Sequence, residues 1–443
     1  MPRRPPSRRR EHDRAIARLA VPAFGALIAE PLYLLADTAI VGNLGVRPLG
    51  GLAVAGILLT SAFGIFNFLA YSTTGAVARR LGAGDERAAA EQGIDGIWLA
   101  AGLGLVLTLA GILLAPVVVD VMGASASVRP FALTYLRISL LGAPFVLIAL
   151  GGAGYLRGLQ DTRTTLVIAV AANTVNLALE VLLVYGLDTG IAGSAWGTVA
   201  AQVLAAAAFL VVVARTARRA QASIRPRAAG VKATAVVGSH LIVRTGSLLL
   251  ALLLTTAVAA RISDVAVAAH QIAFQIWTFL ALALDAIAIA GQALVGKLLG
   301  ADDETGARDA SRRMLEIGIS AGVVLGILTA LLRTVLVPLF TDSSAVATLA
   351  EQVLWFVAAL QPAAAAVFVL DGILIGAGDS RYLAAAMAVA TVAYLPAVGL
   401  VVATDGGLLL LWAAFSLWVL ARLVGMGARY VTDRWLVTGA VRG

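Results

Sequence analysis

Twelve long apolar segments, separated by short polar connections, most constrain what this chain of 443 residues can fold into. They lie at about 16–44, 50–78, 94–119, 130–155, 164–187, 190–215, 235–260, 264–298, 314–340, 350–376, 382–404 and 407–430. Each is long enough to cross ~30 Å of hydrocarbon as a helix, and none has the short alternating pattern of a β-barrel strand. A composition of 60% apolar and 13% charged residues also indicates a membrane protein. The sequence therefore predicts an all-α polytopic membrane protein with twelve transmembrane helices.

The two halves of the chain repeat one another. The loop sequence Leu-Gly-Ala-Gly-Asp that begins at Leu81 returns at Leu299 as Leu-Gly-Ala-Asp-Asp, 218 positions later. Pro144 and Pro362, each inside an apolar segment, keep the same spacing. Six segments per half put both halves into the membrane with the same orientation, so we expect two six-helix pseudo-symmetric lobes.

The predicted organisation has five parts, defined by where the polar stretches fall. They are a disordered basic N-terminal tail (1–14), an N-lobe (15–215), a cytoplasmic linker (216–234), a C-lobe (235–430) and a C-terminal tail (431–443). Most of the 33 Lys and Arg residues lie in the two tails and the even-numbered connections. By the positive-inside rule we expect a multi-pass membrane protein with both termini in the cytoplasm.

The first apolar segment carries polar groups that lipid does not tolerate. Glu30, Tyr33 and Asp37 have the spacing of one helix face, and Pro31 removes one helical hydrogen bond beside them. An acid at membrane depth costs several kcal/mol unless it faces protein or water. We expect Glu30 and Tyr33 to line a substrate cavity and Asp37 to bind a coupling ion. The alternative is that Asp37 only hydrogen-bonds a neighbouring helix.

A second polar face lies in the fifth segment, where Asn173, Asn176 and Glu180 have the same helical spacing. With Asp37, and with Thr198 on the sixth segment, Asn176 and Glu180 could hold a proton or a dehydrated Na⁺, because oxygen-rich sites suit hard cations. Asn173 is expected in the substrate cavity. Interhelical hydrogen bonding is the competing explanation, and for Thr198 alone it is the preferred one.

The second half has different polar residues. The positions 218 after Asp37, Asn176 and Glu180 are Thr255, Tyr394 and Val398. Its own membrane acids are Asp285 and Asp371, which could attract a cationic substrate or instead pair with Arg244 or Arg333. Both alternatives stay open at this level.

Several classes of function lack their sequence signatures. The chain has no cysteine, and it contains no Walker A, GxSxG or HExxH motif. The net charge of +8 reflects membrane topology rather than nucleic-acid binding. We expect no enzyme activity and no cofactor, with H⁺ or Na⁺ as the coupling ion.

Four stretches together resemble the multidrug and toxic compound extrusion (MATE) transporters, in their bacterial DinF-like branch. They are Ala29–Gly42, the loop ending at Asp85, Asn176–Glu180 and Ala268–Ile272. The resemblance implies twelve helices in a V of two lobes, and export of amphipathic, often cationic, small molecules in exchange for H⁺ or Na⁺. It also implies a monomer that lies in a lipid bilayer.

The resemblance maps the family's coupling acid onto Asp37 and a bending proline onto Pro22, with Pro31 as a second bend. Its Asn, acid and Thr fall on Asn176, Glu180 and Thr198. Two positions depart from the family pattern. The acid of the fifth segment is usually Asp, and the acid that another branch carries on the seventh segment is absent.

Three other functions compete with drug efflux. A flippase for a lipid-linked precursor shares the superfamily's lobes, but a pyrophosphate headgroup favours several basic groups in the cavity. The membrane charges here are mostly acidic. A channel would need a selectivity filter, and none is recognisable. A membrane-embedded enzyme lacks the motifs named above.

Overall fold

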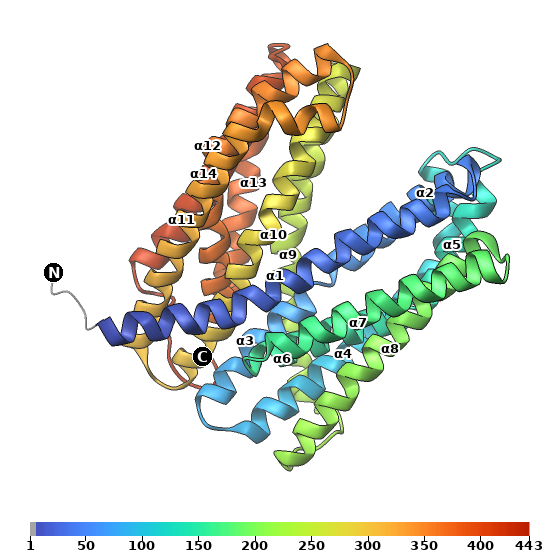
Figure 1. Ribbon diagram of the computed structural model, residues 1–443. Helices are drawn as coiled ribbons and strands as arrows, with labels where there is room; N and C mark the ends of the chain where they lie inside the picture. Colours follow the sequence, from blue (N-terminus) through green and yellow to red (C-terminus); the bar gives the residue numbers. More distant parts are fainter. Residues whose placement is uncertain (1–5, 443) are drawn as a thin grey trace. The chain divides into compact units, whose positions relative to one another are not determined.

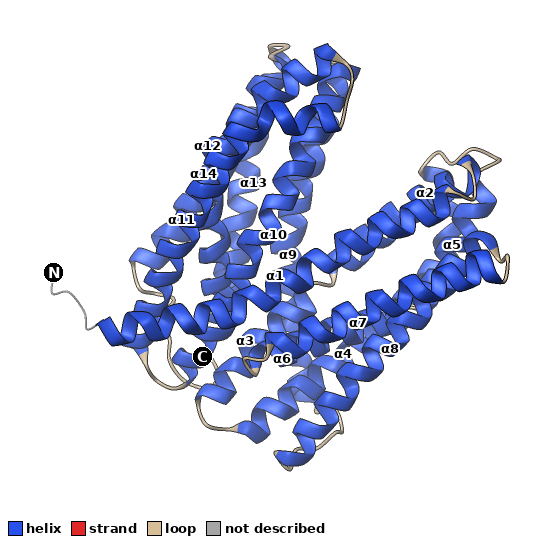
Figure 2. Cartoon of the chain, in the orientation of Figure 1, coloured by secondary structure: helices blue, strands red, loops and turns tan. Residues whose placement is uncertain are grey.

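The computed structural model describes residues 6–442, and within that range every regular element is a helix (Figure 1, Figure 2). Among the described residues, eleven helical segments are long and apolar enough to span a membrane, and the bent pair Arg129–Leu141 and Ala143–Gly158, counted as one span, brings the number to twelve. The prediction of an all-α polytopic membrane protein is confirmed. Large apolar side chains such as Leu113, Leu331 and Val424 are exposed on the outer faces, where lipid replaces water.

The helices of the first half are α1 (Pro6–Gly42), α2 (Val46–Ile65), α3 (Phe68–Gly82), α4 (Glu86–Val121), α5 (Arg129–Leu141), α6 (Ala143–Gly158), α7 (Thr162–Val181), the π-helix η1 (Leu182–Gly186) and α8 (Gly190–Arg219). Those of the second half are α9 (Ala228–Ile262), α10 (Asp264–Gly300), α11 (Glu304–Leu336), the 3₁₀ turn η2 (Val337–Leu339), α12 (Ser344–Gly376), α13 (Ser380–Ala403) and α14 (Gly407–Val431).

The repeat in the sequence is also a repeat of helix boundaries. α3 and α10 end 218 positions apart, at Gly82 and Gly300, and α4 and α11 begin 218 positions apart, at Glu86 and Glu304. Close helix contacts repeat as well. A Cβ on Gly154 would lie 2.5 Å from the carbonyl oxygen of Ala70, and one on Gly372 would lie 2.3 Å from that of Ala288. Glycine at these two positions lets the helix backbones touch.

The chain divides into two compact units, which we call the first-half unit (Val21–Gly238) and the second-half unit (Met1–Ala20 with Ser239–Gly443). The boundaries 20/21 and 238/239 are again 218 positions apart, and they fall inside the unbroken helices α1 and α9. This division differs from the predicted lobes 15–215 and 235–430, because each of these two helices begins in one unit and continues into the other.

The predicted tail and linker are also shorter than expected. α1 begins at Pro6, so most of the tail predicted at 1–14 is helical, and residues 1–5 lie outside the described part. α8 extends to Arg219 and α9 begins at Ala228, which leaves residues 220–227 as the connection in place of 216–234. Both helices extend beyond the apolar segments because polar turns at a helix end are solvated and keep their backbone hydrogen bonds.

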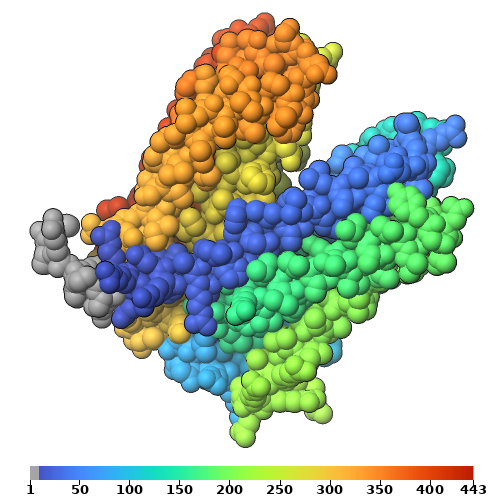
Figure 3. All heavy atoms as spheres, in the orientation of Figure 1, coloured from blue at the N-terminus to red at the C-terminus, as the bar shows by residue number. Residues whose placement is uncertain are grey.

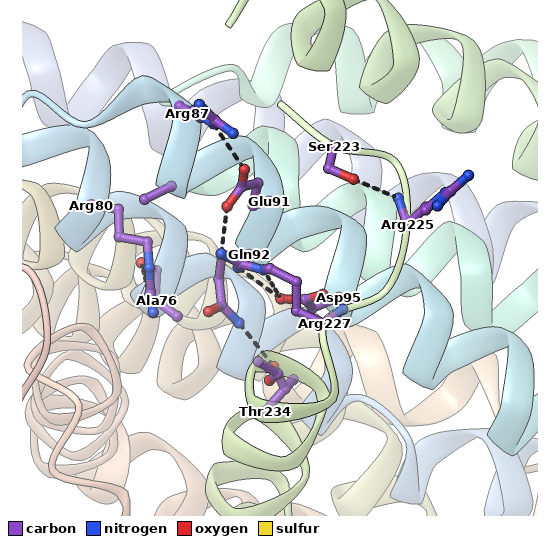
Figure 4. A network of polar contacts seen from close by, with 12 residues as sticks. Ala76, Arg80, Arg87, Glu91, Gln92, Asp95, Ser223, Arg225, Arg227 and Thr234 are labelled. Carbon is purple, nitrogen blue, oxygen red and sulfur yellow. Dashed lines mark hydrogen bonds and ion pairs between the residues drawn. The ribbon is translucent and has the colours of Figure 1, made fainter. Parts of the chain in front are cut away.

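An ion-pair network fastens this connection to α4 (Figure 4). Arg227 donates from its backbone nitrogen to Asp95 Oδ1 at 2.8 Å and from Nη2 to Asp95 Oδ2 at 2.8 Å. Its Nη1 donates to Glu91 Oε2 at 2.5 Å. Nearly two turns into α9, Thr234 accepts from Gln92 Nε2 at 2.8 Å. Asp95 is fully buried, so the start of α9 is held by a carboxylate that solvent does not reach.

The start of α1 is fastened to α11 in the corresponding way. Arg9 lies 218 positions before Arg227, and its Nη2 donates to Glu316 Oε2 at 3.1 Å. Arg313, the counterpart of Asp95, donates from Nε to Asp13 Oδ1 at 2.5 Å. α11 is the repeat counterpart of α4, so ion pairs to counterpart helices hold the starts of both α1 and α9. The sign of the charge differs at one position, where α4 has Asp95 and α11 has Arg313.

The fourth span is bent in the first half only. α5 and α6 meet at Gly142 with a bend of 49°, whereas the counterpart helix α12 is continuous. A Cβ on Gly142 would lie 1.8 Å from Gln202 Oε1 of α8. The backbone at the bend therefore contacts the Gln202 side chain, and a residue larger than glycine at position 142 would displace that side chain. The break places the end of α5 beside α8, where the polar cluster described next is found.

Candidate functional site

The polar groups of α1 separate according to burial. Asp37 is 2% exposed, Tyr33 is half-buried and Glu30 is exposed. The helical face predicted from the sequence is therefore present, but only its far end is enclosed. α1 runs through Pro22 and Pro31 without a break, so these prolines remain predicted bending points inside a continuous helix.

Asp37 receives hydrogen bonds from two side chains that the sequence reading missed. Ser194 Oγ of α8 donates to Oδ1 at 2.7 Å, and Tyr135 OH of α5 donates to Oδ2 at 3.5 Å. Both donors are buried. Ser194 lies four positions before Thr198, and that helical spacing was the available signal. Nothing in the local sequence singles out Tyr135. Its contact with Asp37 depends on how α5 is placed in the folded molecule, next to the bend at Gly142.

Thr198 contacts Tyr33 rather than Asp37. The two hydroxyl oxygens are 2.9 Å apart, and Thr198 Oγ1 also donates to the backbone oxygen of Ser194 at 3.1 Å. Thr198 therefore belongs to the cluster through Tyr33 and through its own helix. Tyr33 and Asp37 each bind α8, which ties one face of α1 to that helix along one turn.

Glu180 and Asn176 complete the cluster from α7. They are 0% and 4% exposed, and Glu180 lies close enough to Asp37 and Ser194 to interact with both. Neither carboxylate oxygen of Glu180, and not the amide oxygen of Asn176, accepts a hydrogen bond within residues 6–442. Three buried oxygen acceptors that receive no hydrogen bond of ordinary geometry from the described residues lie next to a second carboxylate and form an electron-rich site.

Gly197 allows α8 to approach these groups. A Cβ at this position would lie 3.2 Å from the backbone nitrogen of Glu180 and 3.5 Å from Asn176 Oδ1. A larger residue than glycine at position 197 would therefore crowd the backbone of Glu180 and the amide oxygen of Asn176. Within residues 6–442, no group of three or more His, Asp or Glu side chains is placed to hold a metal ion.

Asn173, predicted to line the substrate cavity, joins α7 to α1. Its Nδ2 donates to the backbone oxygen of Ala29 at 3.0 Å, and Tyr185 OH donates to that of Ile40 at 2.9 Å. These contacts join α7 and η1 to α1 near both ends of the polar face. In the space-filling view atoms of α1 and α7 lie side by side (Figure 3). Asn173 is thus a brace between helices.

The two membrane acids of the second half have separate environments. Asp371 is buried and forms a bidentate ion pair with Arg244, whose Nε lies 3.1 Å from Oδ1 and whose Nη2 donates to Oδ2. Of the two alternatives for Asp371, the structure contains the ion pair. Asp285 is half-buried on α10, and Arg333 instead stacks on Trp355 with 4.2 Å between guanidinium carbon and ring centre.

A multi-span helical protein with two repeated halves and a buried titratable cluster in one of them belongs to the class of membrane transporters. The chain belongs to the MatE family, whose model matches residues 22–182 and 242–398. It acts on small molecules as a transporter and is not an enzyme. The resemblance read from the sequence motifs is confirmed.

Named relatives agree with this assignment. The chain is 32% identical over 422 residues to Protein DETOXIFICATION 44, chloroplastic, from Arabidopsis thaliana, covering 92% of this chain and 80% of the relative. It is 28% identical over 426 residues to DNA damage-inducible protein F from Escherichia coli, covering 94% and 91%.

Solved structures share the fold. One described as MATE in the bent conformation has a TM-score of 0.85 at 20% identity and covers 96% of both chains. Another, described as the outward-facing conformation of a multidrug resistance MATE family transporter, has a TM-score of 0.85 at 21% identity and covers 98% of this chain and 97% of that one.

Proposed function

We propose that this protein is a secondary active efflux antiporter that exports amphipathic compounds in exchange for H⁺ or Na⁺. The coupling ion binds at Asp37, Asn176, Glu180 and Thr198. One observation carries the proposal, namely a glutamate with 0% exposure that lies beside a second carboxylate and whose two carboxylate oxygens accept no hydrogen bond of ordinary geometry from residues 6–442. A buried carboxylate without a donor is costly, so a bound cation stabilises this arrangement.

Either ion supplies what the cluster lacks. A proton on Glu180 creates an O–H donor and removes one of two neighbouring negative charges. A Na⁺ would use the unpaired oxygens of Glu180 and Asn176 together with Asp37, since oxygen donors suit hard cations. Ser194 keeps its hydrogen bond to Asp37 Oδ1 in both cases and so holds that carboxylate in place.

Ion binding reaches the rest of the molecule through α1. Asp37 is held by donors on α5 and α8, and any loss of its charge weakens both hydrogen bonds. α1 contains Pro22 and Pro31, where the backbone lacks a hydrogen-bond donor and the helix bends at lower cost. Ion and substrate that favour different shapes of α1 weaken each other's binding by one common factor, which is the thermodynamic basis of antiport.

The substrate class follows from the charges on offer. Glu30, exposed on α1, and the carboxylates of Asp37 and Glu180 favour cationic compounds, and Tyr33 offers an aromatic surface for them. Asp285 is a further candidate. Asp371 is not, because Arg244 already neutralises it.

We propose an inner-membrane location with both termini in the cytoplasm, supported by the Lys and Arg distribution and by the Escherichia coli relative. Since the natural chain has no cysteine, single cysteines report topology cleanly. A cysteine at Ala222 in the 220–227 connection should resist an impermeant maleimide in intact cells, and one at Ser127 should react. The reverse pattern would invert the topology.

Dye efflux from proteoliposomes tests the function. An H⁺ gradient and a Na⁺ gradient are imposed in separate experiments. Wild-type protein should expel a cationic dye under one of them, and the gradient that drives efflux identifies the coupling ion. Glu180→Gln should lose gradient-driven efflux, while Asp120→Asn, a change of an exposed carboxylate at the outer end of α4, should retain it. Efflux by Glu180→Gln at the wild-type rate under both gradients would contradict the coupling site.

A further inference from the structure

The second-half unit contains a buried cluster of charges that the coupling site does not use. Arg244 of α9, Asp371 of α12 and Arg422 of α14 are 9%, 5% and 5% exposed. Three different helices each contribute one charged side chain, and two of these helices, α12 and α14, pack against one another. Charges at such depth are costly in a membrane protein and point to a function.

Within the cluster, Asp371 is fully engaged. Arg244 binds both of its oxygens, through Nε at 3.1 Å and through Nη2. A bidentate guanidinium–carboxylate pair is the strongest common form of ion pair, and its net charge is zero. The negative charge of Asp371 is therefore not available to a cationic ligand.

Arg422 has no carboxylate of its own. Its Nε donates to Met387 Sδ at 3.2 Å, and its guanidinium carbon lies 4.7 Å from the centre of the Trp418 ring. It is within electrostatic range of both Asp371 and Arg244. None of the ion pairs formed within residues 6–442 includes Arg422. A thioether is a weak acceptor and an aromatic face carries no net charge, so neither neutralises the guanidinium.

Two guanidinium groups and one carboxylate give the cluster a net charge of +1. The next acid along the chain, Asp379, does not reduce it, because Asp379 accepts from Arg429 Nε at 2.7 Å and pairs with Arg442 Nη2 at 3.2 Å. An uncompensated buried charge strongly favours a counter-ion. The planar fork of Arg422 matches the oxygens of a carboxylate or phosphate.

We propose that this cluster binds an oxyanion, a carboxylate or phosphate group, with Arg422 as its donor and the Arg244–Asp371 pair beside it. The proposal rests on the efflux function and refines its substrate class to amphipathic cations that also carry an acidic group. Asp371 lies five residues before the end of α12, about 8 Å along the helix. That end faces the cytoplasm in the proposed topology, the side from which an exporter takes its substrate.

Binding is tested on purified full-length protein in dodecyl maltoside with benzoate and its uncharged analogue benzamide, by calorimetry. Wild type should bind benzoate and not benzamide. Arg422→Gln should weaken benzoate binding at least tenfold, and Arg422→Lys should recover part of it. Asp371→Asn raises the charge of the cluster and should strengthen binding, a sign opposite to that expected if Asp371 bound cations. Arg137→Gln, at an exposed arginine of α5, is the matched control.

The oxyanion could come from a solute or from an anionic lipid. Thermal unfolding of wild type and Arg422→Gln in nanodiscs with and without phosphatidylglycerol separates these sources. A phosphatidylglycerol stabilisation that Arg422→Gln abolishes, without benzoate binding, assigns the site to a lipid phosphate. Benzoate affinity and lipid stabilisation that are both equal in wild type and Arg422→Gln would overturn the proposal, as would equal binding of benzamide.

The same measurements separate this proposal from the coupling mechanism. Asp37→Asn should lose gradient-driven efflux yet bind benzoate like wild type, because Asp37 belongs to the other half. If Asp37→Asn keeps its efflux while Arg422→Gln loses benzoate binding, then the coupling site is refuted and the oxyanion site stands.

Discussion

The two halves of this transporter share one frame and fill it with different chemistry. Asn173 Nδ2 donates to the backbone oxygen of Ala29 at 3.0 Å, and 218 positions later Thr391 Oγ1 donates to that of Ser247 at 3.1 Å. The same brace therefore joins the counterpart helices in both halves. The residues around it differ in kind.

Where the first half has carboxylates, the second has a neutral pair and aromatic rings. Thr255, the counterpart of Asp37, lies 2.8 Å from the hydroxyl oxygen of Tyr394, the counterpart of Asn176. Trp412 replaces Ser194 and Phe415 replaces Gly197, and their ring centres are 5.2 Å apart. One half has thus kept a polar site with unpaired oxygens, and the other has closed the corresponding space by packing.

The largest expected effect comes from the variant that tests this difference between the halves. Asp37→Asn should abolish gradient-driven dye efflux in proteoliposomes, because the amide cannot alternate between charged and neutral forms. Thr255→Val, at the counterpart position, should leave efflux within about twofold of wild type, since it removes one neutral hydrogen bond of about 1 kcal/mol. Equal loss in both variants would mean that the halves share the coupling role.

The next effect concerns stability in the second half. Arg244→Met leaves Asp371 buried without its partner and should lower the free energy of unfolding by about 3–5 kcal/mol. Thermal unfolding in detergent measures it. The double variant Arg244→Met/Asp371→Leu removes both charges and should recover most of the loss. If the single variant unfolds like wild type, the pair does not stabilise the fold.

Close helix packing should respond equally in the two halves. Gly154→Ala and Gly372→Ala each push a Cβ against a carbonyl oxygen of a neighbouring helix, which typically costs about 1–3 kcal/mol. The shift in unfolding temperature should be similar for both. Gly56→Ala is the control, because a Cβ there meets nothing within 4 Å. A large shift in only one half would contradict a shared frame.

The smallest effect tests the common brace. Asn173→Leu and Thr391→Val each remove one hydrogen bond to a backbone carbonyl and should cost about 0.5–1.5 kcal/mol. Unfolding temperatures should fall by comparable, small amounts, and ion selectivity should not change in either variant. A change of coupling ion in Asn173→Leu would add Asn173 to the ion site.

Much of this could be read from the sequence. Long apolar runs and the spacing of 218 positions predict twelve helices in two repeated halves, because a backbone in lipid must satisfy its own hydrogen bonds. Asp37, Asn176 and Glu180 stand out since polar groups are costly in such runs. Each of these features belongs to a single segment of the chain, so it can be recognised from the order of the residues alone.

Contacts between segments needed the tertiary structure. The sequence left two alternatives open for Asp371, and the folded structure pairs it with Arg244. Ser194 and Tyr135 are ordinary residues until the bend at Gly142 and the approach of α8 aim them at Asp37. Composition and periodicity fixed the helices because those depend on the solvent around each segment. Which side chains meet depends on rotation, bend and register of helices far apart in the chain, and only the folded molecule specifies these.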